Sequence, residues 1–215
     1  MDVYVGDTRS HKMVRQLEHL GWGRILVDRT VTLYQGEKWV LDNGVYKDWV
    51  SGVSFDGGAY LSRLENFRAW ALWPPDWLVL PEKVAGGVSS LDLSREFSDR
   101  FQAMGMDWPV ALVLQDGMCE QDVGSALRDI PRVQSLFVGG TNDFKATAGR
   151  WVDYARDRGL CCHYGRCGTL RKARHALAVG VSSLDSAFPL WSKERFKEFQ
   201  EAIEGNFLQG DLFYR

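Results

Sequence analysis

The sequence predicts a compact, single-domain (β/α)8 TIM barrel that spans residues 1–215. Eight short apolar runs alternate with segments of helical periodicity, which is typical of a parallel sheet covered by helices. The runs are apolar at successive positions, as expected of strands buried on both faces. A chain of 215 residues with 45% hydrophobic side chains is long enough for one substantial core, although barrels of this type usually have ~250 residues. A doubly wound open sheet is the alternative architecture.

Each unit of the barrel can be followed along the chain. The predicted strands are apolar runs that end in polar residues or glycine, at 3–7, 24–28, 39–44, 77–82, 110–117, 135–140, 160–165 and 181–186. Between them, apolar residues recur every three or four positions and glycine often follows, which predicts helices at 11–21, 59–71, 94–105, 122–130, 143–159 and 169–180. The second unit is the weakest, because residues 29–38 are too short for a good helix.

Composition and charge limit the possible cellular locations and binding partners of the protein. The formal net charge is -2, so a polyanion would have to be held by a local basic patch. The chain contains no run of eighteen apolar residues, and its first residues lack the order of a signal peptide. The four cysteines form neither a disulfide framework nor the paired spacing of a zinc site. We therefore expect a reduced, cytoplasmic protein with no membrane segment, no metal and no cofactor.

Polar residues stand where the predicted strands end, which is where barrel enzymes carry their active sites. These residues are Asp42, Glu82, Gln115, Gly139, Gly140, the segment 163–166 and Asp185. Carboxylates dominate, and neither a metal trio nor a serine or cysteine with a partnered base is evident. Two or three carboxylates suit chemistry at an acetal-like carbon, where one acid attacks and another moves a proton. A glycosidase and an enzyme that breaks an N-glycosidic bond both fit this set.

Several segments, in this order, resemble motifs of the tRNA-guanine transglycosylases. LDNGVYKDW (41–49) resembles the family's DSGGYQ, WLVLPEKVAGG (77–87) falls where its recognition acid stands, and VLQDG (113–117) resembles VQGG. LFVGG (136–140) resembles its paired-glycine segment, and residues 163–187 resemble the MGVGTP…G(I/V)DMFD run that leads to its nucleophile. The CxCxxC…H zinc signature is absent from this sequence, and SAFP replaces the family's PTR. The chain is therefore most similar to the DNA-acting relatives (DpdA type), which exchange guanine for a 7-deazaguanine such as preQ0.

The resemblance implies two catalytic residues. Asp185 would attack C1′ of the nucleotide and form a covalent glycosyl ester. Asp42 would act as general acid toward the departing base and as general base toward the incoming one. The alternative is that either residue has only a structural role, as the cap of the following helix.

The resemblance also implies a set of base-binding residues. Glu82 would accept hydrogen bonds from guanine N1–H and N2–H2, while Gln115 and backbone N–H groups near Gly139 and Gly140 would donate to O6. Tyr46 would stack on the base. The target guanine would have to be flipped or single-stranded, because its edge is inaccessible in a duplex. The alternatives are a surface ion pair for Glu82, a tight turn at the two glycines and rim packing for Tyr46.

Phosphate contacts would come from basic residues near the strand ends. Arg166 is the strongest candidate, because loops after strands seven and eight often hold phosphate in barrels. Arg171, Lys83 and Lys145 could flank the same rim, whereas Lys172 and Arg174 are expected on a solvated helix face. His163 lies beside three cysteines, and we expect a satisfied core histidine there rather than a metal ligand.

Three functional hypotheses follow. The favoured one is base exchange on DNA with a free 7-deazaguanine as the second substrate. The second is the same chemistry on tRNA or a nucleoside, or hydrolysis of the bond. The third is a non-catalytic accessory barrel of the same family. The sequence leaves a partner protein and a homodimer equally open.

Overall fold

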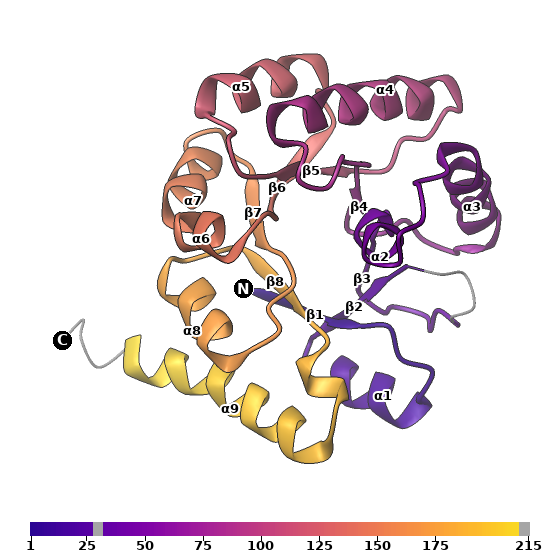
Figure 1. The fold of residues 1–215 in the computed structure, drawn as a ribbon. Coiled ribbons are helices and arrows are strands. Elements are labelled where there is room, and N and C mark those ends of the chain that lie inside the picture. The colour runs from indigo at the N-terminus through magenta and orange to yellow at the C-terminus, as the bar shows by residue number, and fades with distance from the viewer. Residues whose placement is uncertain (28–31, 211–215) are drawn as a thin grey trace.

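The computed structural model describes residues 1–27 and 32–210, with side chains up to Gly205, and contains a closed barrel of parallel strands (Figure 1). The strands are β1 (Asp2–Gly6), β2 (Gly23–Leu26), β3 (Trp39–Leu41), β4 (Leu78–Val79), β5 (Val110–Leu114), β6 (Val133–Val138), β7 (Cys161–Tyr164) and β8 (Ser183–Ser186). Each strand pairs with the next, and β8 pairs with β1, where Tyr4 stands opposite Asp185. The predicted (β/α)8 fold is therefore confirmed, and the open sheet is excluded.

Helices surround the ring of strands (Figure 1). They are α1 (His11–His19), α2 (Val45–Val50), α3 (Gly57–Trp70), α4 (Ser90–Ala103), α5 (Glu120–Asp129), α6 (Asn142–Ala146), α7 (Ala148–Arg156), α8 (Leu170–Ala178) and α9 (Lys193–Gly210), with short 3-10 helices η1 (Gly87–Ser89) and η2 (Phe188–Leu190). All six predicted helical segments contain a helix, and the segment 143–159 contains two because the chain turns at Thr147. The helices α2 and α9 are additions to the predicted set. No helix in the described part of the chain is long and apolar enough to cross a membrane.

Polar side chains fix where four of the helices begin. Ser10, Asp56, Thr141 and Thr169 each accept a hydrogen bond from a backbone N–H in the first turn of the following helix. Such caps satisfy donors that have no partner inside a helix. They set the residues at which α1, α3, α6 and α8 begin.

The strands separate two apolar cores. One core fills the barrel interior and contains eight side chains from β1 to β6 and the residue before β4: Tyr4, Ile25, Val40, Trp77, Val79, Ala111, Val113 and Phe137. The larger core lies between the strands and the helices. Because side chains alternate between the two faces of a strand, Asp42 follows Val40 on the inner face and Gln115 follows Val113. The alternation therefore directs several strand-end polar residues toward the barrel axis.

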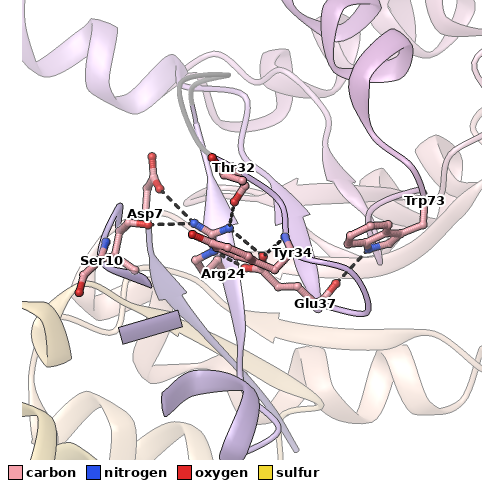
Figure 2. A network of polar contacts seen from close by, with 8 residues as sticks. Asp7, Ser10, Arg24, Thr32, Tyr34, Glu37 and Trp73 are labelled. Carbon is pink, nitrogen blue, oxygen red and sulfur yellow. Dashed lines mark hydrogen bonds and ion pairs between the residues drawn. The ribbon is translucent and has the colours of Figure 1, made fainter. Parts of the chain in front are cut away.

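A network of polar contacts covers β2, the strand with the weak second unit (Figure 2). Ile25 points inward, so the adjacent Arg24 points outward, where it is buried. Arg24 donates to both carboxylate oxygens of Glu37 and to the carbonyl oxygens of Thr8 and Thr32, at 2.9 and 2.7 Å. Trp73 Nε1 donates to the Glu37 carbonyl oxygen at 3.0 Å (Figure 2). A buried ion pair thus covers a face that a helix covers on the other strands.

The described residues between β2 and β3 contain no helix, in agreement with the weak second unit. Asp28, at the end of the predicted second strand, lies outside the described residues. The predicted strand at 39–44 is shorter in the structure, because it ends at Leu41 and Gly44, at a φ of 79°, is the N-cap of α2. That early turn brings α2 to the carboxyl end of the barrel.

Candidate functional site

Three carboxyl groups meet at the carboxyl end of the barrel. Asp42 follows β3, Glu82 follows β4, and Asp185 lies on β8. Asp185 raises the pKa of Asp42, and Asp42 in turn raises the pKa of Glu82, so the three groups interact electrostatically. The structure therefore brings together the three acids that the sequence singles out. In a parallel barrel all carboxyl ends of the strands lie at one end, which explains how residues so far apart in sequence become neighbours.

Asp185 is held through one of its two carboxylate oxygens. Its Oδ1 accepts a hydrogen bond from the Arg166 backbone N–H at 2.9 Å and lies 2.9 Å from Nε2 of His163. Nδ1 of His163 lies 2.8 Å from the Ser183 hydroxyl oxygen. If the Ser183 hydroxyl donates to Nδ1 and the Nε2–H donates to Asp185, both ring nitrogens of His163 have a hydrogen-bond partner. Oδ2 has no hydrogen bond within the described residues, so it is the oxygen available for chemistry. Asp185 caps none of the helices in the described part of the chain.

His163 combines a core position with a contact in the site. The imidazole is buried, and its ring centroid lies 4.7 Å from that of Phe137 and 4.8 Å from that of Trp77. Its position agrees with the expected core histidine, but sequence reasoning missed its contact with Asp185. Within residues 1–27 and 32–205, no three potential metal ligands of the His, Cys, Asp and Glu types gather at one point.

Asp42 titrates unusually high for an aspartate. Burial and the neighbouring Asp185 raise its pKa from 3.8 to about 6, against the lowering effects of the Gly44 N–H, Arg63 and Arg166. A carboxyl group with a pKa close to neutral pH can both give and take a proton. The electrostatics therefore suit Asp42 to general acid and base work.

Glu82 is 9% exposed and is bonded to Asn43, not paired with the exposed Lys83. Burial, and after it the charge of Asp42, raises the pKa of Glu82 from 4.5 to about 8, although the Asn43 hydrogen bond works in the other direction. The Asn43 amide also donates to the Leu80 carbonyl oxygen at 2.9 Å. Asn43 thus fixes the orientation of Glu82, and it is a site residue that sequence reasoning missed.

Arg63 of α3 supports the same corner of the site, and it was also missed. It donates to the Asn43 carbonyl oxygen at 2.5 Å, and its charge lowers the pKa of Asp42. A helix residue twenty positions from its partner offers no local motif by which the sequence could reveal it.

Gln115 has a buried amide oxygen without a hydrogen-bond partner among the described residues. The residue is 5% exposed, and this oxygen is its Oε1. Buried polar atoms nearly always have partners, so an orphaned acceptor at this position suits a ligand that brings an N–H group.

The two glycines after β6 serve different purposes. The Gly139 N–H donates to the Leu114 carbonyl oxygen at 3.0 Å, so the prediction that it donates to a bound base is wrong: the barrel ladder already uses it. Gly140 has a φ of 68°, and a Cβ there would lie 2.5 Å from a carboxylate oxygen of Asp116. The tight-turn interpretation thus holds for Gly140, which is the remaining candidate donor.

Arg166 reaches across the barrel mouth to α2. Its Cζ lies 3.8 Å from the ring centroid of Tyr46, a residue that is 41% exposed and stacks against Trp49 at 5.9 Å. The strands β3 and β7, which precede these two segments, lie on opposite sides of the barrel. Arg166 also lowers the pKa of Asp42 and of Glu82. Arg166 therefore lies among the three acids and covers one face of the Tyr46 ring. This is the ring that we expect to stack on a base.

The other predicted phosphate ligands lie in different environments. Lys83 and Arg171 are exposed, as a phosphate contact requires. Lys145 is only 3% exposed, and its ammonium donates to the Gly165 carbonyl oxygen at 2.5 Å. The prediction of a rim contact by Lys145 is therefore wrong, because its charge lies beneath the surface.

A cavity of ≈ 380 Å³ lies at the opposite end of the barrel, beside α5 and the amino ends of β6 and β7. Its lining includes Arg128 and Arg158 but no acid, histidine or cysteine. The groups capable of acid–base or nucleophilic chemistry are instead gathered at the carboxyl end.

The sequence matches no protein-family profile and no curated protein. The function must therefore be argued from the site residues themselves.

Proposed function

We propose that the protein is a base-exchange glycosyltransferase that replaces guanine in DNA with a 7-deazaguanine such as preQ0. The observation that carries the proposal is the environment of Asp185. One of its oxygens is held by His163 and the Arg166 N–H, and the other is free beside an acid whose pKa is about 6. A fixed nucleophile with an adjacent proton carrier is what displacement at a glycosidic carbon requires.

In the first step, Oδ2 of Asp185 forms a bond to C1′ of the nucleotide while the bond from C1′ to the guanine nitrogen breaks. The bonding electrons leave with the base, and protonated Asp42 supplies a proton to it. The product is a glycosyl ester of Asp185 with inverted configuration.

In the second step, the incoming base loses its ring N–H proton to the Asp42 carboxylate. The freed nitrogen attacks C1′, the ester bond breaks, and the Asp185 carboxylate is regenerated. Two inversions retain the original configuration, and Asp42 returns to its protonated form.

Glu82 and Gln115 would select the base. As a carboxylate, Glu82 accepts from guanine N1–H and N2–H2 together, a pairing that adenine cannot offer. These two donors should lower the pKa of Glu82 from about 8, so base binding should release a proton near neutral pH. A 7-deazaguanine keeps the same edge, which would let one pocket accept both the departing and the incoming base.

DNA is proposed as the polymer because this is what the resemblance to the DNA-acting relatives implies. The rim offers Lys83 and Arg171 as exposed phosphate contacts, with Arg166 deeper in the site. The target guanine would be unpaired or flipped, since a duplex hides C1′ from a carboxylate within a barrel.

The test supplies single-stranded DNA, duplex DNA and unmodified tRNA, each with labelled guanine, together with preQ0. We expect label release from single-stranded DNA that depends on preQ0, and none with the Asp185→Asn variant. Release without preQ0 would identify a hydrolase instead, and release from tRNA alone would identify a tRNA enzyme. DNA binding without any release would identify a non-catalytic barrel.

A further inference from the structure

We infer that Lys145 is a positioning residue for Asp185, and that it acts through the peptide group between Gly165 and Arg166. The Lys145 ammonium donates to the carbonyl oxygen of this peptide at 2.5 Å. The N–H of the same peptide donates to Asp185 Oδ1 at 2.9 Å. A single peptide plane therefore connects a buried cation on one side to the proposed nucleophile on the other.

The burial of Lys145 calls for such a role. The side chain extends from α6 into the protein, where it is 3% exposed and its Nζ lies 5.7 Å from the centroid of the Tyr164 ring. It forms no ion pair with a carboxylate among the described residues. Taking an ammonium group out of water is costly unless strong hydrogen bonds replace the lost hydration. Among the described residues, its ammonium donates to the Gly165 carbonyl oxygen, which lies on the opposite side of the peptide from the N–H that faces Asp185.

The geometry gives Lys145 two effects on Asp185. The first is orientation: an ammonium bonded to the carbonyl oxygen holds the peptide plane, so that the N–H on the opposite side points at Oδ1. The second is polarisation. The positive ammonium next to the carbonyl oxygen polarises the peptide group, and this strengthens the hydrogen bond that the N–H of the same peptide donates. Both effects hold Oδ1, whereas Oδ2 carries no hydrogen bond among the described residues. Arg166 adopts a φ of 55°, uncommon for a residue with a side chain, so the loop depends on such external contacts.

The strength of this connection should depend on pH. Burial, and after it the charge of Arg166, lowers the pKa of Lys145 to about 7, with Lys172 acting in the same direction and Asp185 and Cys167 in the opposite one. Below that pH the ammonium polarises the peptide, and above it a neutral amine donates more weakly. The other titratable neighbours are Tyr164, below the ammonium, and His175, whose Nε2 lies 3.3 Å from the Lys145 carbonyl oxygen.

The hydrogen-bond chain stands on geometry alone, whereas its importance for catalysis rests on the proposed function. The first measurement is therefore independent of activity: the chemical shift of the Arg166 backbone amide, followed by NMR across neutral pH. We expect an inflection near pH 7 in the wild type. In Lys145→Arg the inflection should move to a higher pH or disappear, because arginine stays charged. Lys145→Met should lose the inflection near pH 7, and any response that remains should follow the titration of Asp42 near pH 6 and of Glu82 near pH 8.

Two matched variants exclude other sources of the signal. Lys172→Met removes a nearby charge that makes no contact with this peptide, and it should keep the inflection at a slightly higher pH. His175→Gln removes the neighbouring imidazole and should keep the inflection unchanged. An Arg166 amide that titrates identically in wild type and Lys145→Met, or one that stops titrating only in His175→Gln, would overturn the inference. If Lys145→Met does not fold, the comparison of wild type with Lys145→Arg and His175→Gln decides the question.

The second measurement is base exchange. Lys145→Met should lower kcat by about tenfold to a hundredfold with little change in KM, because the residue orients the nucleophile and does not touch the base. Lys145→Arg should restore part of the loss. Exchange that proceeds at the full rate in Lys145→Met would refute the positioning role while the proposed function stands. A wild type that exchanges no base but shows the Lys145-dependent inflection would refute the function and leave the hydrogen-bond chain intact.

Discussion

At alkaline pH, the protein without a bound base should be less stable with Glu82 than with a glutamine at this position. Its pKa rises from 4.5 in an exposed state to about 8 in the fold, chiefly through burial. The folded state therefore keeps a proton that the unfolded chain has lost, and the resulting stability is complete below pH 4.5 and lost as pH rises through 8. At about 1.4 kcal/mol per pH unit, this difference amounts to roughly 5 kcal/mol.

Glu82→Gln removes the titration and keeps an oxygen that can accept from Asn43. Urea unfolding should show nearly equal stabilities of variant and wild type near pH 5, and a variant that is more stable by roughly 2–5 kcal/mol near pH 9. Glu65→Gln, on the exposed face of α3, is the matched control and should show no such divergence. The same Glu82→Gln variant should bind guanine-like bases at least about tenfold more weakly, because an amide donor would face the base N–H groups. A stability difference that does not change between the two pH values would refute the buried-acid argument, and unchanged affinity would place the base pocket elsewhere.

Three further outcomes are expected. If the proposed function is right, wild type should form a covalent protein–DNA adduct on denaturing gels, and Asp185→Asn should not. An adduct with the variant would remove this residue from the mechanism. Arg166→Ala should flatten the plot of log affinity against log salt by about one unit, whereas Arg166→Lys should keep the slope. Equal slopes in all three proteins would limit Arg166 to its contacts within the site. Arg24→Met should cost about 3–5 kcal/mol in urea unfolding, because it leaves Glu37 buried without its partner. Loss of the exposed Lys38–Asp2 pair should cost at most about 1 kcal/mol, and similar costs for both changes would contradict the account of β2.

The positions of the strands and of the three acids follow from the sequence because both depend on simple regularities. Apolar runs of strand length mark the barrel wall, and parallel order brings every carboxyl end to one edge. Asp42, Glu82 and Asp185 therefore lie together although they are far apart in sequence. The weak second unit was also evident, since residues 29–38 offer too few positions for a helix.

Apart from the contact between the side chains of His163 and Asp185, the contacts that the sequence does not reveal involve the backbone. Lys145 looks like a surface lysine because its acceptor is the Gly165 carbonyl oxygen, which leaves no trace in a side-chain pattern. Asn43 and Arg63 are hidden for the same reason, since each bonds to a main-chain oxygen. The error at Gly139 has a related origin, because only the structure shows that its N–H belongs to the barrel ladder.

The contact between Arg166 and Tyr46 implies an equilibrium between two states of the barrel mouth: a closed state, in which the guanidinium lies on the ring, and an open state, in which it has moved away. A base that stacks on the covered face of Tyr46 must first displace the guanidinium, whose Cζ lies 3.8 Å from the ring centroid. Such a contact at a partly exposed site is worth about 0.5–1 kcal/mol, so the closed state should outnumber the open one by roughly two- to fivefold. The apparent dissociation constant rises by roughly three- to sixfold, because only the open fraction can accept a base. That penalty is small compared with the energy of stacking on an aromatic ring, so the contact would not prevent a base from binding.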